Sequence, residues 1–110
     1  MPLIDFQEVR ILVPITRALD ALGWQEVCRY VGYQLRGQCP IHGSTNPRSR
    51  SFAVHTRLNR WFCHSCKRRG DVIDLWALMN GLSIAEAARE LCDLVGVAVP
   101  TRRGTEKRNG

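Results

Sequence analysis

Two short pairs of metal-binding side chains constrain the fold of this sequence more than any other feature. Cys39 with His42 and Cys63 with Cys66 each have two residues between the members, and twenty residues separate the pairs. Three thiolates and one imidazole suit a tetrahedral Zn²⁺ ion with no position open for water. The pattern therefore predicts one structural zinc. Free thiols, or a disulfide between Cys63 and Cys66, are the alternatives, but neither accounts for the histidine in the first pair.

The length and the cysteine count favour a single metal-stabilised domain. A chain of 110 residues builds only a thin core, which a bound metal would help to stabilise. Five cysteines, an odd number, fit a cytosolic metal protein better than a secreted disulfide scaffold. The sequence has neither a long apolar stretch nor a signal-peptide pattern. We therefore expect a cytoplasmic protein without a membrane partner.

Basic residues are concentrated in the middle of the chain. The formal net charge is +6, yet the stretch between Glu26 and Asp71 contains no acidic residue. That stretch carries nine positive charges, namely Arg29, Arg36, Arg48, Arg50, Arg57, Arg60, Lys67, Arg68 and Arg69. A one-sided run of this kind around a metal site predicts a surface for a polyanion. The alternative is a solvated basic face that serves solubility.

The hydrophobic pattern predicts an α+β fold, with a zinc-ribbon antiparallel sheet flanked by short helices in one domain over residues 1–100. Capping signals place a helical N-terminus at 5–23 and two C-terminal helices at 71–96. The zinc ribbon is expected over 24–69, with strands near 33–38, 51–55 and 60–63, while 24–31 fits either a strand or a loop. We expect the basic tail 101–110 to be disordered, because it lacks apolar anchors.

The remaining reactive side chains do not indicate catalysis. Asp71 and Asp74 lie one turn apart, where carboxylates also favour the helix dipole, so we interpret them as caps rather than as ligands of a catalytic metal. Two further cysteines, Cys28 and Cys92, are interpreted as small core residues. His55 and His64 fit substitute metal ligands or nucleic-acid contacts, but we interpret both as structural. We therefore predict no catalytic residue and no enzyme activity for this chain by itself.

Several motifs in the same order resemble the zinc-binding domain at the N-terminus of bacterial-type DNA primases, from about Val9 to Pro100. They are Cys39-Pro-Ile-His42, Pro47 with Ser51-Phe52, Trp61-Phe-Cys-His-Ser-Cys66, Gly70-Asp-Val-Ile-Asp-Leu75, and Glu86 to Leu91 followed by Val97 to Pro100. The chain departs from this family in two ways. An extra Arg48-Ser-Arg50 lengthens the loop after the first pair, and the sequence stops where the family's polymerase domain begins.

The resemblance implies recognition of a single-stranded DNA template in the cytoplasm, at the nucleoid. It also implies that another chain supplies the primase polymerase domain or a helicase, and that this chain performs no synthesis. The predicted nucleic-acid contacts are Arg48, Arg50, Arg57, Arg60, Trp61, Lys67, Arg68 and Arg69. The competing hypothesis is a zinc-ribbon adaptor that mediates protein–protein contacts in a replication or mobile-element complex.

Aromatic residues interleave with these basic positions, and unpaired bases stack on exposed aromatic rings. We interpret Phe52 and Phe62 as core residues. Tyr30 and Tyr33 remain candidates for stacking, and Trp61 is left open between the core and the binding surface.

Overall fold

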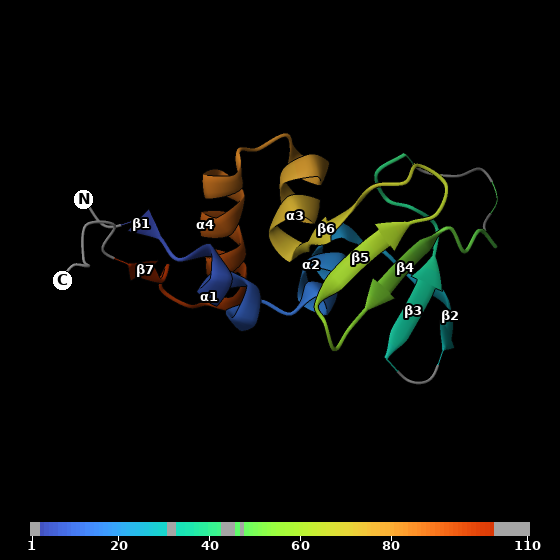
Figure 1. Cartoon of the computed structure of the whole chain (residues 1–110), viewed down its shortest axis with the longest axis horizontal. Helices are drawn as coiled ribbons and strands as arrows, with labels where there is room; N and C mark the ends of the chain where they lie inside the picture. Colours follow the sequence, from blue (N-terminus) through green and yellow to red (C-terminus); the bar gives the residue numbers. More distant parts are fainter. Residues whose placement is uncertain (1–2, 31–32, 43–45, 47, 103–110) are drawn as a thin grey trace.

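The computed structural model describes residues 3–30, 33–42, 46 and 48–102. The elements are β1 (Leu3–Ile4), α1 (Phe6–Leu12), α2 (Ile15–Leu22), β2 (Glu26–Tyr30), β3 (Gln34–Gly37), β4 (Phe52–His55), β5 (Arg60–Cys63), β6 (Arg69–Asp71), α3 (Val72–Asn80), α4 (Ile84–Val95) and β7 (Thr101–Arg102). Figure 1 shows β1 and β7 at one end of the molecule, the helices in the middle and the sheet of β2 to β6 at the other end. This arrangement confirms the predicted α+β class. No helix among the described residues is long and apolar enough to cross a membrane.

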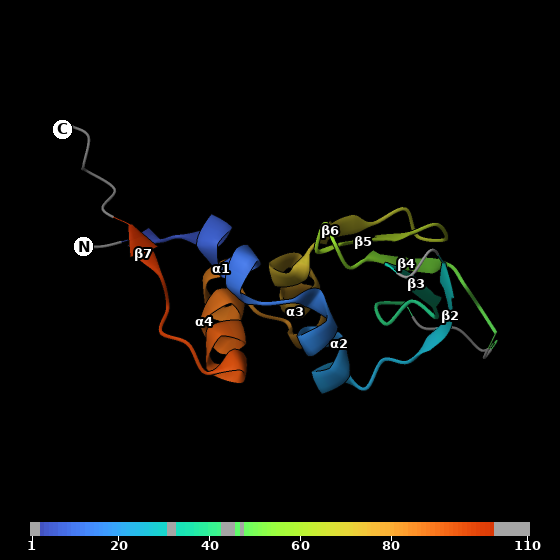
Figure 2. The same cartoon turned by 90° about the horizontal axis from the view of Figure 1, so that it is seen from below.

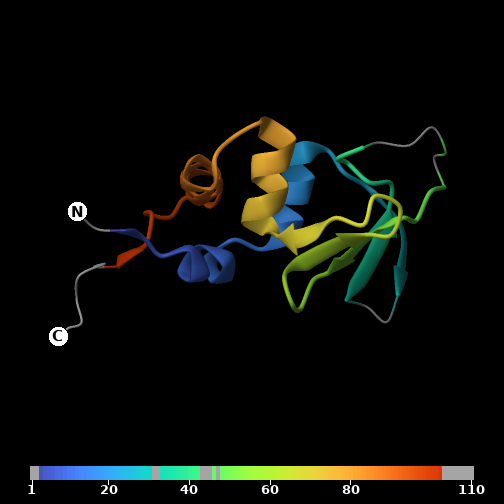
Figure 3. The same ribbon diagram turned by 45° about the horizontal axis from the view of Figure 1, so that its top comes forward.

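Strands β2 to β6 form one antiparallel meander, in which each strand pairs with its neighbour in the sequence. The buried face carries Leu35 on β3, Phe52 and Val54 on β4, and Trp61 on β5, each no more than 5% exposed. Because side chains alternate along a strand, these buried residues fix the register. Figures 2 and 3 show α2 and α3 side by side next to the sheet, with α1 and α4 farther from it.

The two C-terminal helices begin at the predicted caps. The Asp71 side chain accepts a hydrogen bond from the backbone N–H of Asp74, and the Asp74 side chain accepts one from the backbone N–H of Asp71. Ser83 and Glu86 repeat this capping box at α4. The first box also requires a glycine before it, because a Cβ atom at Gly70 would lie 2.6 Å from Oδ2 of Asp74. The capping interpretation of the two aspartates is therefore confirmed.

Several short strands were not predicted from the sequence. Segment 24–31, left open between strand and loop, contains β2, and β6 forms directly before the third helix. Thr101 pairs with Ile4 and Arg102 with Leu3, so the first two residues of the tail form strand β7 with β1. The backbone N–H of Asp5 also donates to the carbonyl of Pro100 at 2.9 Å, which holds the two ends of the domain together. Residues 103–110 of that tail lie outside the described residues.

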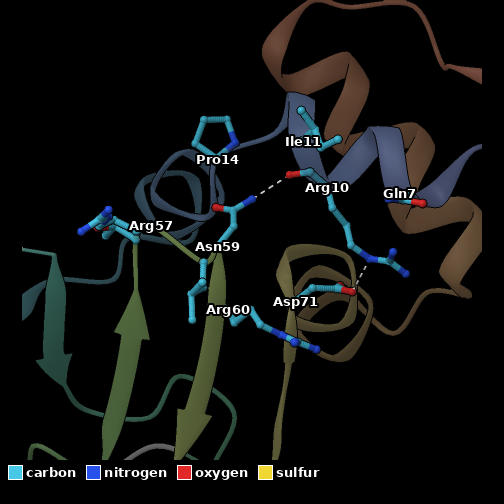
Figure 4. Close-up of a pocket in the computed structure, with 10 residues that line it drawn as sticks. Gln7, Arg10, Ile11, Pro14, Arg57, Asn59, Arg60 and Asp71 are labelled. Atoms are coloured by element: carbon cyan, nitrogen blue, oxygen red, sulfur yellow. Dashed lines mark hydrogen bonds and ion pairs between the residues drawn. The ribbon is translucent and has the colours of Figure 1, made fainter.

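Asn59 connects the β4–β5 hairpin to the segment between α1 and α2. Its Oδ1 accepts a hydrogen bond from the N–H of Ile15 at 2.6 Å, and its Nδ2 donates to the carbonyls of Arg10 and Val13 at 2.7 and 2.9 Å. Figure 4 shows the bond to Arg10. Asn59 has a φ of 59°, in the left-handed region that asparagine tolerates better than most residues. One side chain thus anchors the N-terminal helices to the sheet.

We expect Asn59→Gly to lower the free energy of unfolding by about 2 to 3 kcal/mol, since glycine keeps the left-handed backbone but leaves three helix-end groups without this partner. Asn59→Ala should cost more, because alanine adds backbone strain at a positive φ. Denaturant unfolding of the zinc-loaded protein, followed by tryptophan fluorescence, measures both changes. A cost below about 0.5 kcal/mol for the glycine variant would show that Asn59 is not an anchor.

Candidate metal centre and nucleic-acid interface

The sheet topology brings the two ligand pairs together. Strands β3 and β5 both run antiparallel to β4, so they point in the same direction and their C-terminal ends lie at the same end of the sheet. Cys39 follows β3 by two residues, and Cys63 is the last residue of β5. The ligand atoms of Cys39, His42, Cys63 and Cys66 all lie within 4.8 Å of one another.

Hydrogen bonds shape the ligand pairs and set the ionisation of their thiols. Burial raises the pKa of Cys39 to about 11, although the backbone N–H groups of His42 and Ile41 oppose this shift. Burial acts in the same direction on Cys63, but hydrogen bonds from the backbone N–H of Cys66 and from the His42 side chain outweigh it, and the pKa of Cys63 falls to about 6. The Nε2 atom of His42 lies 3.3 Å from Sγ of Cys63.

The four side chains fit one structural zinc ion. A tetrahedral site with Zn–S bonds of about 2.3 Å places neighbouring sulfur atoms about 3.8 Å apart, which small side-chain adjustments reach from the observed cluster. Cys39 and Cys63 are buried, Cys66 is half-buried and His42 is exposed. None of the five cysteines forms a disulfide, so the disulfide alternative is not realised. Zinc would hold the ends of β3 and β5 together and leave no position for catalysis.

The face opposite the buried one is here called the exposed sheet face, and its residues on β3 to β6 are half-buried or exposed, apart from the buried Asp71. Across β3 to β6, one cross-strand row contains Arg36, Ala53, Phe62 and Arg69, and the next row on the same face contains Gln34, His55, Arg60 and Asp71. Directly opposite residues of antiparallel strands project to the same side, and the two rows are two residues apart along each strand, so both lie on the exposed sheet face. Phe62 is half-buried between Ala53 and Arg69, and its ring meets the edge of the His64 ring with centroids 4.7 Å apart.

The predicted basic contacts belong to the strands of this sheet or to the loops that join them. Arg60 and Arg69 lie on the exposed sheet face, while Lys67 and Arg68 belong to the second ligand turn. The remaining three are Arg57 in the β4–β5 turn and Arg48 and Arg50 in the loop before β4, and all seven side chains are exposed. The Arg36 guanidinium donates to the carbonyl of Arg50 at 2.6 Å, which ties this loop to β3. Pro47, which belongs to the primase-like motif that continues with Ser51 and Phe52, lies outside the described residues.

The structure buries Trp61, which was predicted to contact nucleic acid, so its ring is not exposed for stacking on a base. The residue is 2% exposed, its ring stacks on Phe52 with centroids 5.5 Å apart, and its Nε1 donates to the carbonyl of Asp71 at 2.8 Å. Phe62, which was predicted to be a core residue, is half-buried and projects to the exposed sheet face instead. The sequence could have indicated this, because side chains alternate along a strand and a buried, metal-facing Cys63 places Phe62 on the opposite face. Phe52 is fully buried, as predicted.

The other candidate residues lie outside the metal cluster. His55 Nδ1 accepts a hydrogen bond from the N–H of Leu58 at 3.1 Å, and its ring packs against Tyr33, which agrees with a structural role. Cys92 is fully buried in the core, whereas Cys28 is only partly buried on β2. Asp71 accepts a bond from Nε of Arg10 at 2.5 Å in addition to capping α3.

We expect the purified protein to contain one zinc ion per chain, and we expect Cys39→Ser or Cys66→Ser to lose it together with much of the folded state, because a structural zinc contributes directly to folding. Elemental analysis and thermal unfolding with and without a chelator measure both effects. Cys28→Ser is the matched control and should retain the metal. Full zinc content in Cys66→Ser, or an unfolding temperature unaffected by the chelator, would contradict the assignment.

Comparisons with known proteins agree with this geometry. The sequence profile of the CHC2 zinc finger family, the zinc ribbon of DnaG, matches residues 24–107. The DNA primase of Thermotoga maritima is 40% identical over 61% of this chain and 11% of that protein. The DNA primase of Lactococcus lactis is 28% identical over 96% of this chain and 16% of its own length.

A solved structure extends the comparison to the fold. The crystal structure of the Aquifex aeolicus primase, comprising its zinc-binding and RNA polymerase domains, superposes with a TM-score of 0.68 at 28% identity, covering 94% of this chain and 23% of that one. This chain spans less than a fifth of the length of the Thermotoga maritima and Lactococcus lactis primases. With a profile that matches most of its residues and a ligand cluster that fits one zinc ion, the chain belongs to the CHC2 zinc finger family of DNA primases.

Proposed function

We propose that this chain is a zinc-dependent module that binds a single-stranded DNA template for a primase polymerase domain or a helicase supplied by another chain. The observation that carries the proposal is the exposed sheet face, where Phe62 lies between Ala53 and Arg69 in a row that also contains Arg36. An aromatic ring among guanidinium groups is the arrangement on which unpaired bases stack while their phosphates are neutralised.

The charge distribution supports an anionic partner. Asp71 is the only acidic residue in the two cross-strand rows of the exposed sheet face, and both of its carboxylate oxygens accept hydrogen bonds within the fold. The exposed arginines around the face supply affinity that depends on salt and carries little sequence information. Stacking on Phe62 would favour unpaired strands over duplex DNA, whose bases are already stacked.

The relatives supply the context of the proposal. The two named above are DNA primases of which this chain matches 11% and 16%, and the Aquifex aeolicus structure joins a zinc-binding domain to an RNA polymerase domain. In the proposed division of labour this chain holds the template, while the polymerase domain holds nucleotides and catalytic metal ions. The module by itself would perform no synthesis and would act in the cytoplasm at the nucleoid.

A second candidate is an adaptor that contacts other replication proteins. Leu78 on α3 and Ile84 on α4 are 47% and 43% exposed, and both lie near the turn that joins these helices. Exposed aliphatic residues of this kind fit a protein partner better than a nucleic acid. Failure to bind single-stranded DNA would favour this candidate.

We expect fluorescently labelled single-stranded DNA to bind at about 50 mM salt, with affinity falling steeply toward about 200 mM because counterions are released from the strand. Replacing Arg48 and Arg50 together by glutamine should flatten the dependence of affinity on salt, by about 0.7 in logarithmic slope for each phosphate that is no longer neutralised. A fluorescence anisotropy titration measures the slope. Absence of binding at the lower salt concentration would end the proposal.

Phe62→Leu should weaken single-strand binding by about 1 to 3 kcal/mol, since leucine fills the same half-buried space but offers no ring for stacking. Phe62→Tyr is the matched control and should bind within about twofold of the original protein, because it keeps the ring. Zinc content should be unchanged in both variants. Equal affinities for leucine and tyrosine at this position would exclude stacking on Phe62.

Lys67→Gly separates charge from folding in the second ligand turn. Lys67 has a φ of 62°, where glycine is favoured, so we expect stability to change by no more than about 1 kcal/mol. The lost charge should nevertheless weaken single-strand binding and reduce its salt slope. Thermal unfolding and the anisotropy titration report the two properties independently. An unchanged affinity in a stably folded variant would remove Lys67 from the interface.

A further inference from the structure

A groove of about 740 Å³ opens beside the exposed sheet face, where α1 approaches the β4–β5 hairpin. Figure 4 shows the residues around it, which come from α1, from the segment before α2, from the hairpin turn and from the start of α3. Its lining includes Gln7, Arg10 and Ile11 from α1 together with Leu58 and Arg60 from the hairpin. None of these residues belongs to the metal centre.

The groove is positively charged. Three arginines line it, Arg10, Arg57 and Arg60, against one carboxylate, Asp71. The carboxylate is already committed, because Oδ1 accepts from the N–H of Asp74 and Oδ2 accepts from Nε of Arg10. That second bond holds the Arg10 guanidinium by one nitrogen and leaves its terminal amino groups without a partner among the described residues. Arg60 likewise has no ion pair within the described part of the chain.

The groove also presents apolar surface. Ile11 and Leu58 are 69% and 64% exposed, and Pro14 also lines the groove. Exposed aliphatic side chains beside guanidinium groups suit a ligand that alternates flat apolar groups with anionic ones. A nucleic acid strand has this chemistry, with bases and sugars between phosphates.

We propose that this groove is a phosphate-binding subsite that receives the part of a single strand that has crossed the exposed sheet face. The inference rests on the proposed function. Arg60 belongs to both surfaces, and it lies two residues, about 7 Å, from Phe62 along β5. A strand stacked on Phe62 that follows β5 away from the metal centre therefore reaches Arg60 first and then Arg10 on α1.

The same phosphate chemistry is present in a free nucleoside triphosphate, whose size also suits the groove. The continuity with the exposed sheet face favours the strand. The two sources differ in one measurable respect, because only a strand links the groove to Phe62 and makes binding depend on strand length.

Gln7→Glu tests the subsite with little risk to the fold. Gln7 is an exposed residue in the first turn of α1, where a carboxylate favours the helix dipole. The matched control is Gln25→Glu, which makes the same charge change at an exposed position outside the groove. The zinc-loaded full chain is titrated with labelled oligodeoxythymidines of about 4 and about 12 nucleotides, and the longer one is then challenged with ATP.

We expect Gln7→Glu to weaken binding of the longer strand by about fivefold and to leave the shorter strand within twofold, while Gln25→Glu changes both by less than twofold. ATP should displace the longer strand only weakly. Equal effects of the two substitutions, with the original protein still binding DNA, would overturn the subsite and leave the proposed function standing. Strong displacement by ATP would instead assign the groove to a free nucleotide and overturn the strand path. No binding of either strand by the original protein would overturn both proposals.

Discussion

The convergence of four ligand atoms at the ends of β3 and β5 is the constraint on which this structure depends. The strands of the sheet are short, with three to five residues each, and a core of this size supplies little stability. A zinc ion held by Cys39, His42, Cys63 and Cys66 links the two strands that flank β4 and therefore stabilises the register of the whole meander. The conformation of the exposed sheet face follows from this link.

The two faces of the sheet differ in composition and in burial. One face is packed against the helices through residues such as Phe52 and Trp61, whose indole N–H reaches the backbone just before α3. The other face carries Arg36, Phe62 and Arg69 in one cross-strand row, with the Arg36 guanidinium bonded to the carbonyl of Arg50. Asn59 and Asp71 connect this sheet to α1, so the N-terminal helix lies close enough to extend the basic surface beyond the strands.

Features set by local chemistry could be predicted from the sequence. The ligand pairs need only tight turns, and the caps at Asp71 and Ser83 act within one helical turn, so both appear as short patterns. Features set by long-range packing could not. Strand β6 has only three residues and pairs with β5, and the groove at Arg10 lies where Asn59 and Asp71 bond to α1 from distant parts of the sequence. Which of Trp61 and Phe62 is buried falls between these two cases. Side chains alternate along β5, so a buried Cys63 places Trp61 on the buried face and Phe62 on the other.

The central claim is that zinc organises a surface that binds single-stranded DNA. The most direct test measures the affinity for one labelled single strand, at constant ionic strength, of the zinc-loaded protein, of the protein after chelation, and of the chelated protein after zinc is returned. The account predicts that affinity is lost on chelation and recovered with one equivalent of zinc, because the arginines keep their charge but lose their arrangement. Undiminished affinity in the metal-free protein would contradict it.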